Sequence, residues 1–168
     1  MTEAQLIVTT LDAPWLPSGS TAEVWAGDDC SLPEPAVIVR LLLTRTAGAS
    51  EPEFFCVETV KGMDLPTRFL GPADARERPA YGIARLAEDV FGRPDVTTRC
   101  IGYVRNVVPR PDASYPHPTP YAHVLVLLAT QAAEPVVAGD WVTLERGRAE
   151  LTTRHWWPIV DHHLAGQP

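Results

Sequence analysis

The sequence has little cysteine and almost no lysine. Its three cysteines, Cys30, Cys56 and Cys100, are odd in number and far apart. They therefore form neither a disulfide framework nor the closely spaced pairs that hold zinc, and we expect those in apolar, strand-like stretches to be small buried residues. Lys61 is the only lysine, and every other basic side chain is an arginine, a bias that we attribute to a GC-rich genome.

Long hydrophobic runs are also absent. The longest, around residues 37–44 and 124–129, have the length of a β-strand and are too short to span a bilayer. The first ten residues have neither the basic start nor the apolar core of a signal peptide. The net charge of −7 argues against nucleic acid or an anionic membrane as the main partner, because both favour basic surfaces. We therefore expect a cytoplasmic protein that binds neither.

Length and composition indicate one globular domain. The chain has 168 residues, of which 45% are hydrophobic, enough for a core that needs no disulfide or metal. Residues 1–35 are rich in turn-forming residues and contain only two short strand candidates, at 5–9 and 22–26. We interpret them as an N-terminal extension packed on a domain that covers residues 36–168.

Apolar segments bounded by turns predict a sheet. Residues 36–44 are almost continuously apolar, which indicates a central strand, and residues 53–60 would return from it as a hairpin. Two further strands are predicted at 97–108, with a bend near Gly102, and at 121–130. Five prolines in the segment 109–120 forbid helix and central strand, so this segment is a long loop.

Helical spacing of apolar residues appears twice. Ala80, Ile83, Ala87, Val90 and Phe91 form one stripe, and Gly92 followed by Pro94 ends the helix. Residues 148–164 predict a C-terminal helix that Pro158 bends or splits.

The segment 64–92 resembles the Nudix box. Gly71, Glu77, Arg85 and Gly92 stand at the spacing of that motif, and the preceding Leu-Pro-Thr-Arg resembles the Leu-Pro-Gly-Gly found before the helix in many Nudix hydrolases. Counted from the proline of this tetrapeptide, Arg85 lies further along the chain than the family places it. We interpret this as a short loop insertion; the alternative is that the Gly71 and Glu77 matches are accidental. The resemblance implies an α/β fold of the Nudix type, with a mixed β-sheet flanked by helices in a single domain.

The box departs from the family pattern at its metal ligands. In Nudix enzymes, glutamates after the arginine hold a divalent cation against a pyrophosphate. Here the residue after Arg85 is Leu86, and the Glu-Glu pair reads Asp89-Val90, with Glu88 one residue out of register. Mg²⁺ requires several oxygen ligands, and aliphatic side chains provide none. Asp89 and Glu88 are thus the remaining candidates for metal binding.

Several residues are candidates for ligand binding or catalysis, although each also has a purely structural interpretation. By resemblance, Arg85 would orient Glu77, whereas an exposed ion pair with Asp89 is the simpler alternative. Arg68 replaces a family glycine at the edge of the cleft and suits a phosphate or carboxylate. The remaining candidates come from the proline-rich loop and the strand after it, where histidine can act as an acid or base or simply pack: Tyr115, His117, Tyr121 and His123.

Two functions from different classes follow from the resemblance. The first is a Nudix hydrolase-like enzyme with weak or atypical activity on a nucleoside diphosphate derivative, which uses Glu77, Arg85, Glu88 and Asp89 with Mg²⁺ or Mn²⁺. The second is a catalytically inactive Nudix-fold protein that binds a small molecule or a protein partner and needs no metal. Where the ligand is a small molecule, we expect it to be phosphorylated, and a homodimer is included among the predicted assemblies.

Overall fold

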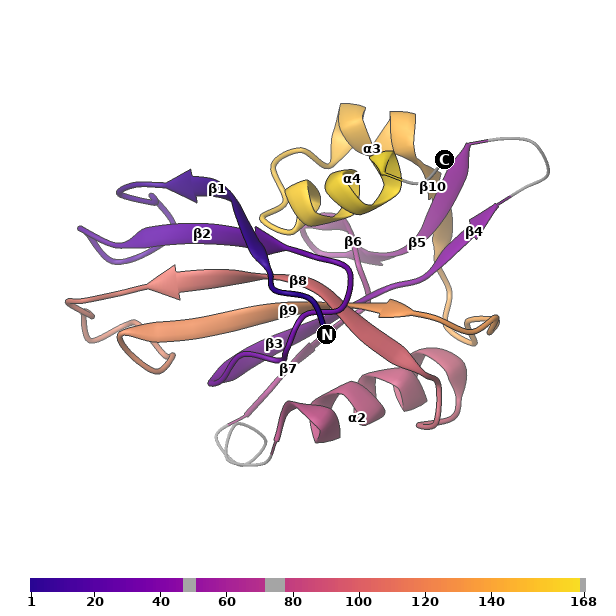
Figure 1. Ribbon diagram of the computed structural model, residues 1–168, viewed down its shortest axis with the longest axis horizontal. Coiled ribbons are helices and arrows are strands. Elements are labelled where there is room, and N and C mark those ends of the chain that lie inside the picture. Colours follow the sequence, from indigo (N-terminus) through magenta and orange to yellow (C-terminus); the bar gives the residue numbers. More distant parts are fainter. Residues whose placement is uncertain (47–50, 72–77, 167–168) are drawn as a thin grey trace.

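The computed structural model describes residues 1–46, 51–71 and 78–166. These residues form one mixed α/β domain with a six-stranded mixed sheet, a smaller antiparallel sheet and, within the described ranges, three helices (Figure 1). No helix in this part of the chain is long and apolar enough to cross a bilayer. Residues 72–77, which belong to the segment where a loop insertion is predicted, lie outside the described residues.

The large sheet has the order β1-β2-β8-β9-β3-β7. Its neighbouring strands are antiparallel except β3 and β9, which are parallel. The predicted central strand is confirmed, because β3 lies inside the sheet and is largely buried. Residues 1–35 contribute two of the strands. The six strands are β1 (Gln5–Thr10), β2 (Thr21–Ala26), β3 (Ala36–Leu42), β7 (Thr67–Phe69), β8 (Thr98–Val107) and β9 (Tyr121–Ala129).

The strand pairing in the small sheet differs from the predicted hairpin. Residues 36–44 were expected to pair with 53–60, but β3 leaves for the large sheet and only the short β4 (Thr44–Thr46) pairs with β5 (Pro52–Thr59). The reason is burial: β3 is apolar on both faces and is covered on both only in the large sheet. The other strands that pair with β5 are β6 (Gly62–Asp64) and β10 (Asp140–Thr143).

Helices cover both faces of the large sheet (Figure 1). Helix α2 (Pro79–Phe91) packs on β3 and β7, whereas α4 (Trp157–Ala165) packs on β2 and β8. Two core clusters correspond to the two faces, one containing Leu86 and Val90 of α2 and the other containing Ile159 and Val160 of α4. Side chains on β3 therefore point alternately toward α2 and toward α4.

Helix α2 ends as predicted. Gly92 has φ 72°, and its N–H donates to the Glu88 carbonyl, which is the left-handed ending that glycine favours. The buried face includes Leu86 as well as Ala87 and Val90, whereas Ala80 is exposed. The predicted stripe is thus wrong at Ala80, because the helix turns its Leu86 side toward the sheet.

The C-terminal segment forms two helices rather than one. Helix α3 (Leu144–Glu150) begins where Thr143 accepts a hydrogen bond from the Arg146 N–H, and α4 follows after a connection over residues 151–156. The prediction that Pro158 bends or splits a helix over 148–164 is wrong in position, since this proline occupies the first turn of α4, where no backbone N–H is required. The connection instead carries the buried Trp156.

Glycine 102 provides a test of the packing between sheet and α4. A Cβ at Gly102 would overlap the Trp25 carbonyl oxygen and lie 2.9 Å from Cγ2 of Ile159. We expect Gly102→Ala to lower the free energy of unfolding by about 3 kcal/mol, the upper end for overpacking, as measured by urea denaturation. Gly166→Ala is the control, because its Cβ would lie at an ordinary 3.4 Å from the nearest atom. Equal stabilities of the two variants would contradict this packing.

Candidate functional site

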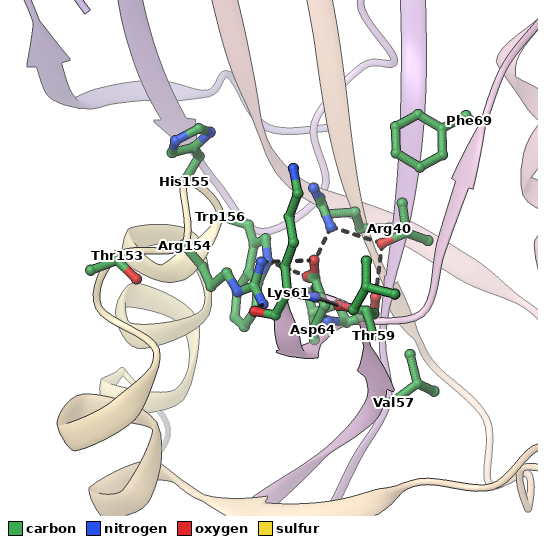
Figure 2. Close-up of a pocket in the computed structure, with 13 residues that line it drawn as sticks. Arg40, Val57, Thr59, Lys61, Asp64, Phe69, Thr153, Arg154, His155 and Trp156 are labelled. Carbon is green, nitrogen blue, oxygen red and sulfur yellow. Dashed lines mark hydrogen bonds and ion pairs between the residues drawn. The ribbon is translucent and has the colours of Figure 1, made fainter. Parts of the chain in front are cut away.

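A pocket of about 470 Å³ opens on the α4 side of the large sheet, next to its β7 edge. Four parts of the chain meet there: β3, the β5–β6 hairpin, β7 and the α3–α4 connection (Figure 2). Its polar lining includes three cationic side chains, one carboxylate and one imidazole, which belong to Arg40, Lys61, Arg154, Asp64 and His155.

The Asp64 carboxylate organises the floor of the pocket. Its Oδ1 accepts hydrogen bonds from Arg40 Nη1 at 2.9 Å, from Trp156 Nε1 at 2.7 Å and from the Leu65 N–H at 2.8 Å. Its Oδ2 lies 3.3 Å from Arg154 Nη1. The carboxylate thus joins β3, β6 and the α3–α4 connection through charge-assisted bonds.

Besides its contact with Asp64, each arginine has a hydrogen bond that fixes its direction. Arg40 Nη1 also donates to the Thr67 hydroxyl on β7 at 2.8 Å. Arg154 Nη2 donates to the Lys61 carbonyl oxygen at 2.8 Å. Burial lowers the pKa of Arg40, partly offset by the charge of Asp64, and an arginine still remains a cation at any physiological pH.

Lys61 is positioned by a tight turn between β5 and β6. The Lys61 N–H donates to the Thr59 hydroxyl at 3.1 Å, and this hydroxyl donates to the Gly62 carbonyl at 2.7 Å. Gly62 has φ 90°, a left-handed conformation that suits glycine. The Lys61 ammonium forms no ion pair with any described residue, and its side chain extends toward the space between His155 and Phe69 (Figure 2).

The pocket therefore carries excess positive charge. Arg40, Lys61 and Arg154 contribute three positive charges and Asp64 one negative charge, a formal balance of +2 in a protein whose net charge is −7. The two arginines are only partly exposed, at 17% and 20%, so solvent screens them less than it screens surface charges. Such a site attracts anions.

Apolar and aromatic side chains form the walls. Phe69 is 70% exposed beside the pocket, and Val57 lies at its lower end (Figure 2). On the other side, the His155 ring stacks on Trp15 with centroids 4.1 Å apart and an angle of 23°. The pocket thus combines a charged floor with apolar walls, a combination that is common in small-molecule sites.

A second cavity of about 270 Å³ adjoins the first. Both are lined by Lys61, Thr153 and Arg154, and we call these three shared residues the ridge. Beyond the ridge the lining changes, with Met63 and Glu150 in place of cations and aromatic rings.

The predicted site residues on α2, and Arg68 on β7, lie on the face of the sheet opposite the pocket. Arg85 pairs with Glu88 at 3.0 Å rather than with Asp89, which lies 3.5 Å from Arg68. Glu88 and Asp89 are about half exposed, at 48% and 56%. The Arg68 Nε is buried without a hydrogen-bond partner in the described structure. Glu77 lies outside the described residues.

The proline-rich loop and β9 contribute no residue to either cavity. The Tyr115 and His117 rings contact each other edge to face at 5.5 Å. His123 is buried, with Nδ1 3.0 Å from the Pro35 carbonyl oxygen, which indicates a structural role. Tyr121 is exposed beneath the Arg105 guanidinium. As predicted, Tyr121 and His123 share one face of β9.

The α2 residues do not form a site that suits a hard cation. Among the described residues, no three His, Cys, Asp or Glu side chains are grouped as metal ligands. Leu86 and Val90, which replace two glutamates of the family motif, are buried in the core below α2. The donor set described on this helix, Glu88 and Asp89, is occupied by Arg85 and Arg68. Mg²⁺ needs more oxygen ligands than this arrangement offers.

Sequence reasoning missed the pocket residues, although two signals were present. Arg40 interrupts an otherwise apolar strand, and a charge inside a buried strand requires a partner. Lys61 is the only lysine and precedes a glycine in a turn. The remaining members, including Asp64 and Arg154, are brought together only by the tertiary fold.

Comparison of the sequence with protein-family models and with curated proteins finds no match. The similarity to Nudix proteins therefore depends on the residues of segment 64–92 alone.

Removing the Asp64 charge should destabilise the fold. Asp64→Asn leaves Arg40 without its anionic partner, and breaking a largely buried pair costs about 3 kcal/mol. We expect this loss in urea denaturation. Asp161→Asn is the control, because the Arg148–Asp161 pair is more exposed, at 53% and 37%, and such pairs contribute less than about 1 kcal/mol. A loss as small as the control's would mean that Asp64 does not organise the floor.

Acid should destabilise the protein through its histidines. Burial is the main cause that lowers the pKa of His117, His123, His155 and His163 below 6.5. Below pH 6.5 the unfolded chain then binds more protons than the folded one, so stability falls as the pH falls. We expect the melting temperature to be level above about pH 7 and to decrease by roughly 2–4 °C for each kcal/mol lost. A melting temperature constant down to about pH 5 would contradict this expectation.

Proposed function

We propose that this protein is a Nudix-like binding protein that holds a small phosphorylated molecule in the pocket on the α4 side of its sheet. The observation that supports this most directly is the excess of positive charge at Arg40, Lys61 and Arg154 in a protein that is acidic overall. Phosphate is the biological anion that such a cluster favours, since guanidinium groups bind its oxygens in pairs and lysine adds a point charge.

The hydroxyl groups of the pocket support a phosphate ligand further. Thr59, Thr67 and Thr153 all line the pocket beside the cations. A hydroxyl can donate to a phosphate oxygen while it accepts from a neighbour. The Thr67 hydroxyl already accepts from Arg40 and donates to the Leu65 carbonyl, which fixes the guanidinium for the ligand.

The two cavities favour a nucleoside diphosphate derivative. The diphosphate would lie over the ridge of Lys61, Thr153 and Arg154, with the apolar-walled cavity on one side and the cavity that contains Glu150 on the other. A planar group suits the first cavity because of Phe69 and His155. A hydroxylated group suits the second because a carboxylate accepts hydrogen bonds.

Hydrolysis on α2 fits this geometry poorly. The helix and the pocket lie on opposite faces of the sheet, as the two core clusters show. A cation beside Asp89 would be separated from the anion site by β3 and β7. We therefore place binding ahead of metal-dependent hydrolysis, and Mg²⁺ or Mn²⁺ is not required for the proposed function.

Calorimetry with ADP-ribose, a nucleoside diphosphate linked to a sugar, tests the proposal. We expect binding in the presence of a chelator, weakened by salt. Lys61→Gln should weaken it roughly tenfold, equivalent to about 1.4 kcal/mol, because the ammonium has no ion-pair partner among the described residues and its loss leaves the fold intact. Arg93→Gln is the matched control, since it removes one exposed charge beyond the end of α2.

Two results would contradict the proposal. One is the absence of binding by both ADP-ribose and inorganic pyrophosphate at low salt. The other is binding that requires Mg²⁺ or Mn²⁺, is lost in Asp89→Ala and is accompanied by release of phosphate products. That second result would establish the hydrolase.

A further inference from the structure

His155 lies on the wall of the proposed anion pocket, but the ring on which its imidazole stacks belongs to a residue outside the pocket. The connection between α3 and α4 carries His155, whereas Trp15 comes from the loop between β1 and β2. Their rings stack nearly parallel, with centroids 4.1 Å apart. The imidazole therefore has an indole on one side and the charged pocket on the other.

The loop that carries Trp15 is fixed by its own hydrogen bonds. The Gly19 N–H donates to the Asp12 carboxylate at 3.1 Å, and the Ala13 N–H donates to the Ser20 carbonyl at 3.1 Å. Ala13 and Ser20 are buried at the base of the loop. One proline on each side of the Trp15-Leu16 pair, Pro14 and Pro17, restricts the backbone further. The indole is thus a preformed support for the imidazole.

Burial and the positive charges that face His155 both favour the neutral form of its ring. Burial first, and then the positive charges of Arg40 and Arg154, lower the pKa of His155, whereas Asp64 opposes them. Lys61 lines the same pocket and adds to the positive charge. The carboxylate of Asp12, in the loop that carries Trp15, is engaged by the Gly19 N–H.

We infer that His155 takes up a proton when an anion enters the pocket and then binds that anion as an imidazolium ion supported by Trp15. This inference rests on the proposed function of the pocket. A bound phosphate would offset the repulsion from the two arginines and give the new cation a partner. The indole face stabilises a stacked cation and so acts in the same direction. The proton comes from solvent, and no covalent bond changes.

Proton uptake has a consequence for affinity. Because the complex holds one more proton than the free components, binding strengthens as the pH falls, by at most about tenfold for each pH unit. The effect is limited to the interval between the pKa of His155 in the free protein and its pKa in the complex. A neutral ligand would cause no such proton uptake, so protonation of His155 strengthens the binding of anions only.

Calorimetry with ADP-ribose in two phosphate-free buffers of different ionisation enthalpy measures the uptake. The diphosphate diester does not itself titrate near neutral pH, so the protons are assigned to the protein. We expect an uptake approaching one proton per complex and affinity that rises as the pH is lowered from about 7.5 to about 6. His155→Gln should still bind, more weakly, with almost no uptake and a flat pH profile. His162→Gln, an exposed histidine on α4, is the control and should behave as the unmodified chain.

Substitutions of Trp15 separate support from simple packing. Trp15→Phe should retain most of the uptake, because an aromatic face remains, whereas Trp15→Leu should reduce it while the melting temperature stays near that of Trp15→Phe. Binding of ADP-ribose without proton uptake, or with the same uptake in His155→Gln, would overturn this inference and leave the proposed function standing. The absence of binding at every pH would overturn the proposed function and, with it, the inference.

Discussion

The pocket depends on one carboxylate that neutralises only part of the charge around it. Asp64 accepts hydrogen bonds from Arg40 and Trp156 and pairs with Arg154, so β3, β6 and the α3–α4 connection meet at two oxygen atoms. Two guanidinium groups close to each other would repel strongly in a partly buried site. One carboxylate between them makes the arrangement stable and still leaves the site positive. The stability of this arrangement and the anion affinity that we propose therefore have the same origin.

The two faces of the sheet are chemically different. On the α2 side, Leu86 and Val90 pack into an apolar cluster with β3 and β9, and the exposed carboxylates of the helix are paired with arginines. On the α4 side, the side chains of β3 point alternately to the two faces of the sheet. This brings Arg40 to the part of that face that α4 does not cover. A metal ion beside α2 and an anion in the pocket would lie on opposite faces of the sheet and could not act on the same bond. The geometry thus favours binding over the chemistry that the box resemblance implies.

Much of the fold followed from local sequence, whereas the site did not. The apolar run before residue 43, the glycine after α2 and the prolines of 109–120 each have a local physical meaning, and each was predicted correctly. Asp64 and Trp156 are 92 residues apart, and no periodicity connects them. The α3–α4 connection was predicted as helix because its apolar residues fit that spacing. In fact Trp156 is buried beside Phe54, which leaves Arg154 and His155 beside it to line the pocket.

The stacked pair of Trp15 and His155 shows how such a pocket can adjust its charge. The pocket is lined by three cations and a single carboxylate, and a permanent fourth positive charge would add repulsion to both arginines. Histidine avoids this cost because its ring can remain neutral until an anion is present. The N-terminal loop supplies the aromatic surface against which either form of the ring can rest. Residues 1–35 thereby contribute to the pocket as well as to the sheet, through a contact between the first and last parts of the chain.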